Sequence, residues 1–268
     1  MHILDEIVAN KRLEVAARKA ELGLDRLEGE SAFWREPNRS LVQSLTRFGS
    51  TGIIAEFKRK SPSKGWFKEA GQAVEPVVGA YNVNGAAGIS VLTDTPYFGG
   101  HLEDLMRARV TADVPVLRKD FMIDPWQIAE AKAFGADVIL LIAACLSKNA
   151  VADLAGYAHS LGLEVLLEIH NEEELGHICD AVDMVGVNNR DLKTFRVDIG
   201  TSLRLINKIP TVQPAVAESG ISDAETIVTL KQAGFRGFLI GETFMKEADP
   251  AIAFAGFVKK LKAKADEN

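Results

Sequence analysis

The sequence predicts an α/β fold, a (β/α)8 or TIM barrel with extra N-terminal helices. Eight short apolar runs rich in Val, Ile and Leu recur from about residue 50 onward, which is typical of strands buried on both faces of a parallel sheet. Segments of helical periodicity separate the runs, without a break in composition. Barrels of this kind commonly form from about 250 residues, and the chain has 268. A doubly wound open sheet uses the same alternation, but it calls for a G-x-G-x-x-G turn that the sequence lacks.

The predicted strands are followed by helices with recognisable ends. In chain order the strands are TGIIAEF (51–57), AGISVLTD (87–94), VPVLRKDF (114–121), ADVILLIAA (136–144), LEVLLEI (163–169), VDMVGVNN (182–189), PAVAESG (214–220) and FRGFLIG (235–241). Residues 147–162 and 222–234 have the periodicity of barrel helices. The second of these helices is expected to begin after an N-cap at Ser222 and to stop at Gly234.

Helical segments also flank the predicted barrel. Residues 3–23 and 40–49 have helical periodicity and precede the first strand, while 254–268 reads as an amphipathic helix that frays into a polar tail. We therefore expect one barrel domain over residues 1–268, of which residues 1–50 are an N-terminal helical extension.

Charge and cysteine content narrow the function classes. The formal net charge of −6 argues against a nucleic-acid binder, and a basic cluster inside an acidic chain favours a small anionic ligand. Cys145 and Cys179 cannot form a disulfide framework and lack metal-site spacing. The N-terminus has no continuous signal-peptide core, and no apolar run approaches the ~18 residues that span a membrane. We therefore expect a cytoplasmic protein without nucleic-acid or membrane partners, as a monomer or weak homo-oligomer.

Polar side chains gather where the predicted strands end. Ile54, Glu56 and Lys58 alternate along one strand and therefore share one face. The same alternation on four further strands adds Lys119, Glu168, Asn188, Arg190 and Glu218. Each charge could simply face water, but five strands that end in this way favour a polar mouth, where lysines and carboxylates pair or do acid–base work. We expect a lysine among other cations to lose its proton more readily, and a glutamate among apolar neighbours to keep one longer.

A second group of residues predicts a phosphate site. The segments AESGIS (217–222) and LIGETFM (239–245) follow the seventh and eighth strands, where barrels often bind phosphate through backbone N–H groups. Ser61 follows the first strand and could add a hydroxyl group. Gly220 and Gly241 could instead be simple turn formers.

Other polar residues carry weaker signals. The histidines lack metal-site spacing and are interpreted as surface or incidental residues, and no neighbouring histidine marks Cys145 as a nucleophile. The long connection from Arg59 to about Gly71 is predicted to be a lid, with Gly65 and Gly71 as hinges.

Seven motifs in order along the chain resemble the indole-3-glycerol phosphate synthase family. They are AEFKRKSPSKG, SVLTDTPYFGG, VLRKDFMIDPWQI, LLEIHNEEEL, VGVNNRDLKTF, AVAESGI and FLIGETFM. The resemblance covers essentially the whole chain and implies a carboxy-lyase of tryptophan biosynthesis that uses neither metal nor organic cofactor. Its substrate would be 1-(2-carboxyphenylamino)-1-deoxyribulose 5-phosphate. The chain holds one barrel, so we expect it to lack the fused isomerase barrel of some relatives.

The resemblance also implies roles for individual residues. Lys119 matches the general acid that protonates the ribulose carbonyl during ring closure, and Glu168 matches the acid–base glutamate of the later dehydration. Glu56 and Lys58 match a pair that holds the substrate carboxylate and takes part in proton transfer. The division of that transfer among Glu56, Lys58 and Glu168 is left open.

The remaining implied contacts bind the substrate. Asn188 and Arg190 resemble groups that orient the substrate carboxylate and hydroxyls, and Glu218 resembles one that holds a hydroxyl. The implied phosphate site consists of Ser61, Ser219, Gly220, Gly241 and Glu242, and the implied anthranilate pocket of Phe98, Phe121 and Leu192. Because a carboxylate would repel phosphate, we expect only the backbone N–H of Glu242 to face the ligand.

Two alternatives remain open at this stage. Phosphoribosylanthranilate isomerase is also a phosphate-binding barrel, but it would be expected to have a cysteine base where this chain has Glu56 and Lys58. A non-catalytic phosphate-binding barrel could serve as a scaffold, although no expected catalytic residue is missing.

Overall fold

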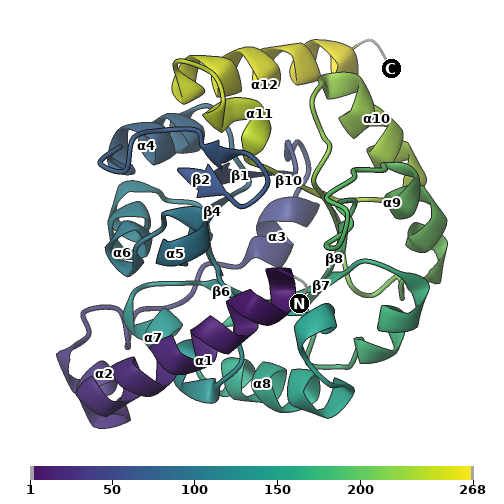
Figure 1. Ribbon diagram of the computed structural model, residues 1–268. Coiled ribbons are helices and arrows are strands. Elements are labelled where there is room, and N and C mark those ends of the chain that lie inside the picture. The colour runs from purple at the N-terminus through teal and green to yellow at the C-terminus, as the bar shows by residue number, and fades with distance from the viewer. Residues whose placement is uncertain (1–2, 267–268) are drawn as a thin grey trace.

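Eight parallel strands close into a barrel in the computed structural model, which describes residues 3–266 (Figure 1). The barrel strands are β1 (Ile53–Phe57), β4 (Gly88–Leu92), β5 (Val116–Lys119), β6 (Val138–Ile142), β7 (Glu164–Ile169), β8 (Met184–Asn188), β9 (Ala215–Glu218) and β10 (Gly237–Ile240). Their order around the ring is β1, β10, β9, β8, β7, β6, β5 and β4. Each predicted run contains one of these strands, so the predicted barrel is confirmed.

Helices surround the barrel on its outer side (Figure 1). The longer ones are α4 (Glu75–Val83), α6 (Leu102–Thr111), α7 (Pro125–Ala133), α8 (Lys148–Ser160), α9 (Gly200–Leu205), α10 (Ala224–Ala233) and α12 (Pro250–Asp266). Short helical turns are α5 (Thr95–Phe98), α11 (Glu242–Met245), η1 (Ala143–Cys145), η2 (Glu172–His177) and η3 (Ile206–Lys208). The predicted polar tail after α12 lies outside the described residues. No helix within residues 3–266 is both long and apolar enough to cross a membrane.

The core has an inner and an outer part, because successive side chains of a strand point to opposite sides. Ile54, Leu117, Leu166 and Val216 belong to the cluster inside the barrel. Their strand neighbours pack with the surrounding helices in a larger outer cluster. Residues on the inner face therefore continue, at the carboxyl end of each strand, into the mouth of the barrel.

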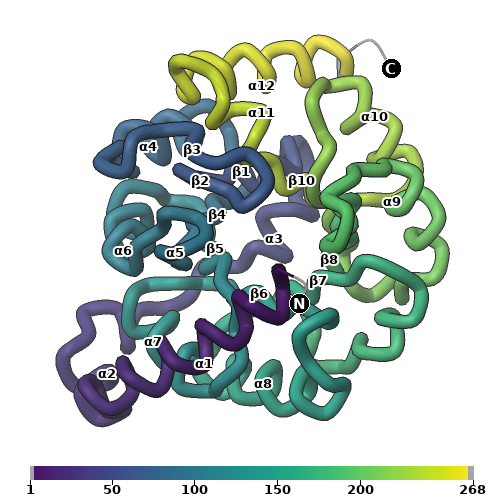
Figure 2. Tube along the Cα trace, in the orientation of Figure 1, coloured from purple at the N-terminus to yellow at the C-terminus, as the bar shows by residue number. Residues whose placement is uncertain are grey.

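Three helices precede β1, and two of them close the ends of the barrel. They are α1 (Ile3–Glu21), α2 (Leu24–Glu30) and α3 (Leu41–Thr46), of which α2 had not been predicted. Leu41 and Leu45 of α3 join the inner cluster, and Glu164 accepts the backbone N–H of Leu41 at 2.7 Å near the start of β7. In Figures 1 and 2, α1 lies on the opposite side, with its N-terminal turn near the centre of the ring of strands.

One local prediction needs correction. Helix α10 has its N-cap at Asp223 rather than Ser222, because the Asp223 carboxylate accepts the backbone N–H of Thr226 at 2.8 Å. The long connection after β1 contains a small antiparallel hairpin, β2 (Lys60–Ser61) with β3 (Gly65–Trp66). Its predicted movement as a lid stays a prediction.

Candidate active site

A cavity of about 320 Å³ opens at the carboxyl ends of the barrel strands. Apolar residues of the inner cluster, including Leu140 and Leu239, line its floor. All fifteen residues singled out from the sequence line it: Glu56, Lys58, Ser61, Phe98, Lys119, Phe121, Glu168, Asn188, Arg190, Leu192, Glu218, Ser219, Gly220, Gly241 and Glu242. They meet because every strand of a closed parallel barrel ends on the same side.

Lys119 ends β5 with its ammonium group between two buried carboxylates. Its Nζ lies 2.8 Å from Glu218 Oε2 and 3.2 Å from Glu168 Oε2. Burial acts to lower the pKa of Lys119, but the charges of Glu218 and Glu168 outweigh burial and raise it. Our expectation of a lysine among other cations, with an easily lost proton, is therefore wrong. Lys119 is an ammonium that can hydrogen-bond, or give a proton to, an oxygen that gains negative charge.

Glu168, near the end of β7, is the second centre of the cavity. Besides Lys119, it accepts a hydrogen bond from Asn188 Nδ2 at 3.1 Å on Oε1. His170 Nε2 lies 3.1 Å from the same Oε1 atom. Burial alone would raise the pKa of Glu168, but Lys119 and His170 outweigh burial and lower it. Glu168 is therefore ionised, because Lys119 and His170, rather than apolar side chains, surround its carboxylate.

His170 had been interpreted as a surface or incidental residue, and the structure contradicts this. Its side chain is only 9% exposed and lies between two carboxylates, with Nδ1 3.3 Å from Glu174 Oε2. Burial would lower the pKa of His170, but Glu168 and Glu174 raise it to about 10. The available signal was that His170 follows Glu168 by two positions, which puts both on one side of an extended chain.

Glu218, at the end of β9, has one oxygen bound and one free among the described residues. Its Oε2 accepts a hydrogen bond from Lys119 Nζ. Its Oε1 is buried and accepts no hydrogen bond from the described residues. Burial raises the pKa of Glu218 to about 7, against the pull of Lys119. Gly186 leaves the space for Oε1, because a Cβ atom at Gly186 would lie 2.2 Å from it. This carboxyl group can therefore exchange hydrogen bonds with a substrate hydroxyl.

Glu56 and Lys58 form an ion pair at the end of β1. Lys58 Nζ donates to Glu56 Oε1 at 2.7 Å, and the Glu56 side chain is 3% exposed. Gly241 allows this arrangement, since a Cβ atom there would lie 2.4 Å from Glu56 Oε1. Lys58 remains 15% exposed and can turn to a substrate anion.

The residues predicted to bind phosphate lie together on one side of the cavity. Ser219 and Gly220 both have positive φ, 63° and 78°, and an L-residue such as Ser219 adopts this conformation mainly where the surroundings impose it. The Ser61 hydroxyl is buried and has no hydrogen-bond partner among the described residues. The Glu242 carboxylate lies 3.2 Å from Arg190 Nη2 and is thus engaged by a cation. The expectation that only its backbone N–H faces the ligand stays a prediction.

An apolar wall faces the charged groups. The rings of Phe98 and Phe121 lie 6.1 Å apart, and Leu192 also lines the cavity. Ile3, Leu4 and Ile7 of α1 also line the cavity, although they were not predicted as site residues from the sequence. The helical periodicity of α1 showed that it has an apolar face, but not where that face docks.

Neither cysteine lines this cavity. Cys145 lies in η1 beside a separate hollow, and burial raises the pKa of its thiol to about 12. Cys179 packs against the outer cluster. Residues 3–266 also contain no group of three or more His, Cys, Asp and Glu side chains suited to hold a metal ion.

The barrel and its mouth of paired lysines and carboxylates define the protein as an enzyme of acid–base chemistry built on a (β/α)8 barrel. The sequence model of indole-3-glycerol phosphate synthase matches residues 4–257. The chain belongs to the indole-3-glycerol phosphate synthase family.

Individual relatives agree with this assignment. The chain is 49% identical to an indole-3-glycerol phosphate synthase of Bacteroides thetaiotaomicron over 259 residues, which cover 97% of this chain and 98% of the relative. It is 44% identical to one of Rhodospirillum rubrum over 253 residues, which cover 92% and 95%. A mutant tryptophan synthase alpha-subunit from Pyrococcus furiosus has a similar structure, with a TM-score of 0.62, 16% identity and coverage of 81% of this chain and 100% of that one. The last similarity concerns the fold alone.

Proposed function

We propose that the cavity at the barrel mouth converts 1-(2-carboxyphenylamino)-1-deoxyribulose 5-phosphate to indole-3-glycerol phosphate, carbon dioxide and water. The observation that carries this proposal is the position of Lys119 between Glu168 and Glu218 in the lining of the cavity. The identity of the substrate is inferred from the family motifs, and the ion pairs around Lys119 support the roles assigned to the residues. The reaction belongs to the biosynthesis of tryptophan.

The first step is ring closure, for which we assign the acid to Lys119. The ring carbon that bears the carboxylate forms a bond to the ribulose carbonyl carbon, and the carbonyl oxygen takes up a proton and becomes a hydroxyl. An ammonium whose charge is secured by two carboxylates stabilises the negative charge on that oxygen and supplies the proton. Loss of carbon dioxide then restores the aromatic ring with little help from the protein.

The second step is dehydration, for which we assign the acid–base work to Glu168. A base must remove a proton from the new five-membered ring while an acid protonates the departing hydroxyl, which leaves as water. Glu168 is ionised and oriented by Asn188 and Lys119, so its carboxylate is unprotonated and able to accept that proton. Lys119 lies within 3.2 Å of Glu168. After Lys119 has taken up a proton from solvent to replace the one given in ring closure, it can protonate the departing hydroxyl. Glu56 and Lys58 form the other available proton-transfer pair.

The substrate ends are assigned to opposite parts of the cavity. Lys58, Asn188 and Arg190 are positioned to hold the substrate carboxylate and hydroxyls, with Glu218 as a further hydroxyl partner. The unpartnered Ser61 hydroxyl supports the assignment of phosphate to Ser61, Ser219, Gly220, Gly241 and Glu242. The anthranilate ring is assigned to the apolar wall of Phe98, Phe121 and Leu192.

A fluorescence assay tests the proposal. Purified protein is mixed with the carboxyphenylamino-deoxyribulose phosphate, and we expect indole fluorescence to grow with release of one carbon dioxide per product. Inorganic phosphate should inhibit competitively. Tight substrate binding by folded protein without product would instead indicate a scaffold, and formation of the substrate from phosphoribosylanthranilate would indicate the isomerase.

A further inference from the structure

Helix α1 contributes an apolar roof to the cavity and is attached to the barrel by apolar and by ionic contacts. Val15 packs with Trp126 and Ala129 of α7, and the ionic contacts are centred on Lys11. Ile3, Leu4 and Ile7 line the cavity from the N-terminal turns of α1. One turn further along, Lys11 is 1% exposed although it is a lysine on an N-terminal helix. A lysine is rarely buried to this extent unless it is paired, so its partners indicate how α1 is held.

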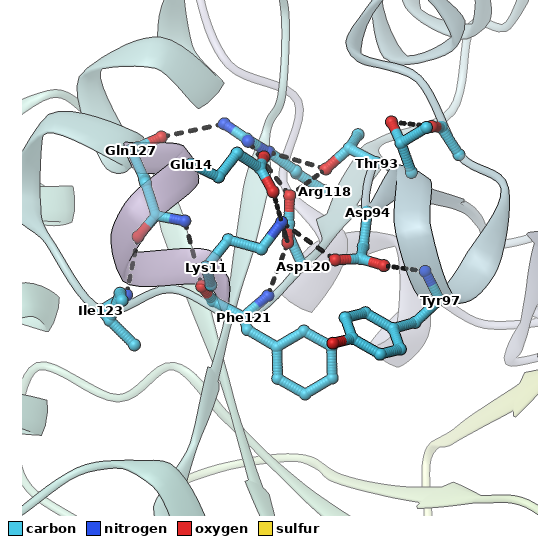
Figure 3. Close-up of polar contacts among 12 residues, drawn as sticks. Lys11, Glu14, Thr93, Asp94, Tyr97, Arg118, Asp120, Phe121, Ile123 and Gln127 are labelled. Carbon is cyan, nitrogen blue, oxygen red and sulfur yellow. Dashed lines mark hydrogen bonds and ion pairs between the residues drawn. The ribbon is translucent and has the colours of Figure 1, made fainter. Parts of the chain in front are cut away.

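Three carboxylates surround the Lys11 ammonium (Figure 3). Its Nζ lies 2.8 Å from Glu14 Oε2, 3.0 Å from Asp94 Oδ1 and 3.0 Å from Asp120 Oδ1. Glu14 belongs to α1 itself, Asp94 follows β4, and Asp120 follows β5. Lys11 thus connects the N-terminal helix to the ends of two neighbouring barrel strands.

Each barrel carboxylate also holds a part of the active site. Asp120 comes directly after Lys119, and its Oδ1 accepts the backbone N–H of Phe121 at 2.8 Å. Asp94 is the N-cap of α5, whose last residue is Phe98, and it accepts the backbone N–H of Tyr97 at 2.9 Å. The two aromatic residues of the apolar wall and Lys119 therefore lie within four residues of a carboxylate bound to Lys11.

The side chains of the barrel do not by themselves balance the negative charges of Asp94 and Asp120. Arg118 lies 3.2 Å from Asp120 Oδ2, but it also pairs with Glu130, and Thr93 shares the same Asp120 oxygen. Asp94 is 0% exposed, and its Oδ1 accepts no hydrogen bond within the described part of the chain, so Lys11 is the cation that faces this atom. Burial would lower the pKa of Lys11, but Asp120 and Asp94 outweigh burial and raise it, so the ammonium keeps its charge.

We propose that Lys11 is a positioning residue for catalysis, which fastens α1 to the ends of β4 and β5 and thereby sets the roof of the cavity against its aromatic wall and Lys119. This inference rests on the function proposed above for the cavity. Without the ammonium, Asp94 and Asp120 repel each other, and α1 loses the Lys11 ion pairs to these strand ends. The pair of Arg18 with Glu130 still holds the following turns of α1 to α7. The roof and the wall would then separate, while the phosphate side near Gly220 and Gly241 would keep its shape.

The test compares Lys11→Met with Lys19→Met in the full chain. Methionine keeps the apolar stem of Lys11 and removes the charge. Lys19 lies on the same helix, but it is 49% exposed in its pair with Asp124, so its loss should change kcat/KM by no more than about twofold. For Lys11→Met we expect kcat/KM to fall by about 100-fold, mainly through a higher KM, as for misplaced contacts. The inhibition constant of inorganic phosphate should stay within about twofold of wild type.

Two further variants separate positioning from general stability. Lys11→Arg should retain most of kcat/KM because it restores a cation. Lys11→Met combined with Asp94→Asn removes the repulsion between residue 94 and Asp120, and the asparagine keeps an N-cap for α5. This double variant should recover stability to urea while its KM stays high. If Lys11 only stabilises the fold, one of two results is expected. Either the double variant recovers both its stability to urea and a wild-type KM, or Lys11→Met lowers the amount of active enzyme without a change in KM. Either result overturns the proposal.

A readout without turnover separates this inference from the proposed function. Hydrogen exchange of the α1 amides should be faster in Lys11→Met than in Lys19→Met, with the barrel strands unchanged. If the wild type makes no indole product, then the proposed function fails, and exchange still tests the attachment. If the wild type is active and Lys11→Met matches it in KM and in α1 exchange, then only the inference on Lys11 fails.

Discussion

Replacement of Lys119 by methionine is the most informative single perturbation of this site. The change removes an ammonium group that lies 2.8 Å from Glu218 and 3.2 Å from Glu168, and it keeps an apolar stem of similar length. Both carboxylates are buried, with side-chain exposures of 1% and 4%. Lys119→Met therefore affects catalysis and stability together, and the two effects need separate estimates.

The catalytic effect follows from the role of a general acid. Such a group contributes about 10²- to 10⁴-fold to the rate, which corresponds to about 2.7 to 5.5 kcal/mol of transition-state stabilisation at 1.36 kcal/mol per tenfold. The stability effect follows from the two carboxylates that lose their cation. Breaking a buried pair costs about 3–5 kcal/mol, less whatever is recovered when Glu218 takes up a proton. A domain with about 5–15 kcal/mol of stability is weakened by this change but can still fold.

The assay is indole fluorescence at saturating substrate, normalised to folded protein from urea unfolding. Arg109→Met is the matched control, because Arg109 forms a buried pair with Asp137 at 2.7 Å and neither residue lines the cavity. We expect the control to lose stability on a similar scale while its turnover per folded molecule stays within about twofold of wild type.

Lys119→Met should lose at least about 100-fold in turnover per folded molecule. Retention of turnover within about tenfold of wild type would refute the assignment of Lys119 as the general acid. Equal losses in Lys119→Met and Arg109→Met would show that turnover follows stability rather than proton donation.

Two further predictions concern the groups around this centre. The pKa of His170 is raised to about 10, above its ordinary value of about 6.5, so its stabilising contribution is complete below pH 6.5 and is lost as the pH rises through 10. Urea unfolding should therefore show His170→Gln to be less stable than wild type at pH 6, with the difference vanishing above about pH 10; a difference that does not depend on pH would contradict this. Gly241→Ala places a Cβ atom 2.4 Å from Glu56 Oε1 and should lower kcat/KM by about 10- to 100-fold through displacement of Glu56. Gly156→Ala in α8 meets nothing within 4 Å, so it should leave kcat/KM unchanged and stabilise the protein by about 0.5–1 kcal/mol. Wild-type kinetics in Gly241→Ala would mean that the geometry of Glu56 is not required.

The fold could be predicted because its signals are local and repeated. Each barrel strand is a short apolar run, and each run is followed by a helix, so the periodicity of the sequence is enough to count them. The candidate site could be predicted for the same reason. Glu56, Lys119, Glu168 and Glu218 lie at or near strand ends, and strands that run parallel around a closed barrel bring those ends together.

The electrostatics of the site could not be predicted in this way. The sequence-based expectation was that a lysine among other cations would lose its proton more readily. The structure instead surrounds Lys119 with Glu218 and Glu168, which raise its pKa. The role of His170 was missed because the second carboxylate beside it, Glu174, comes from η2 rather than from a strand. A pKa depends on distances of a few ångströms between side chains, and sequence spacing gives these only within one element.

The hydrophobic pattern is enough to predict a (β/α)8 barrel, the strands that form it and the polar residues at its mouth, because parallel packing and strand alternation follow from that pattern. Three features depend on tertiary contacts instead: how those residues pair, that the pKa of Glu218 lies near neutrality, and that α1 roofs the cavity through Lys11. These features could not be predicted because the residues involved are distant in sequence. Lys11, for example, forms ion pairs with Asp94 and Asp120, which lie more than eighty positions away. No local sequence pattern specifies such a contact. It forms because a buried ammonium group needs carboxylates nearby to balance its charge.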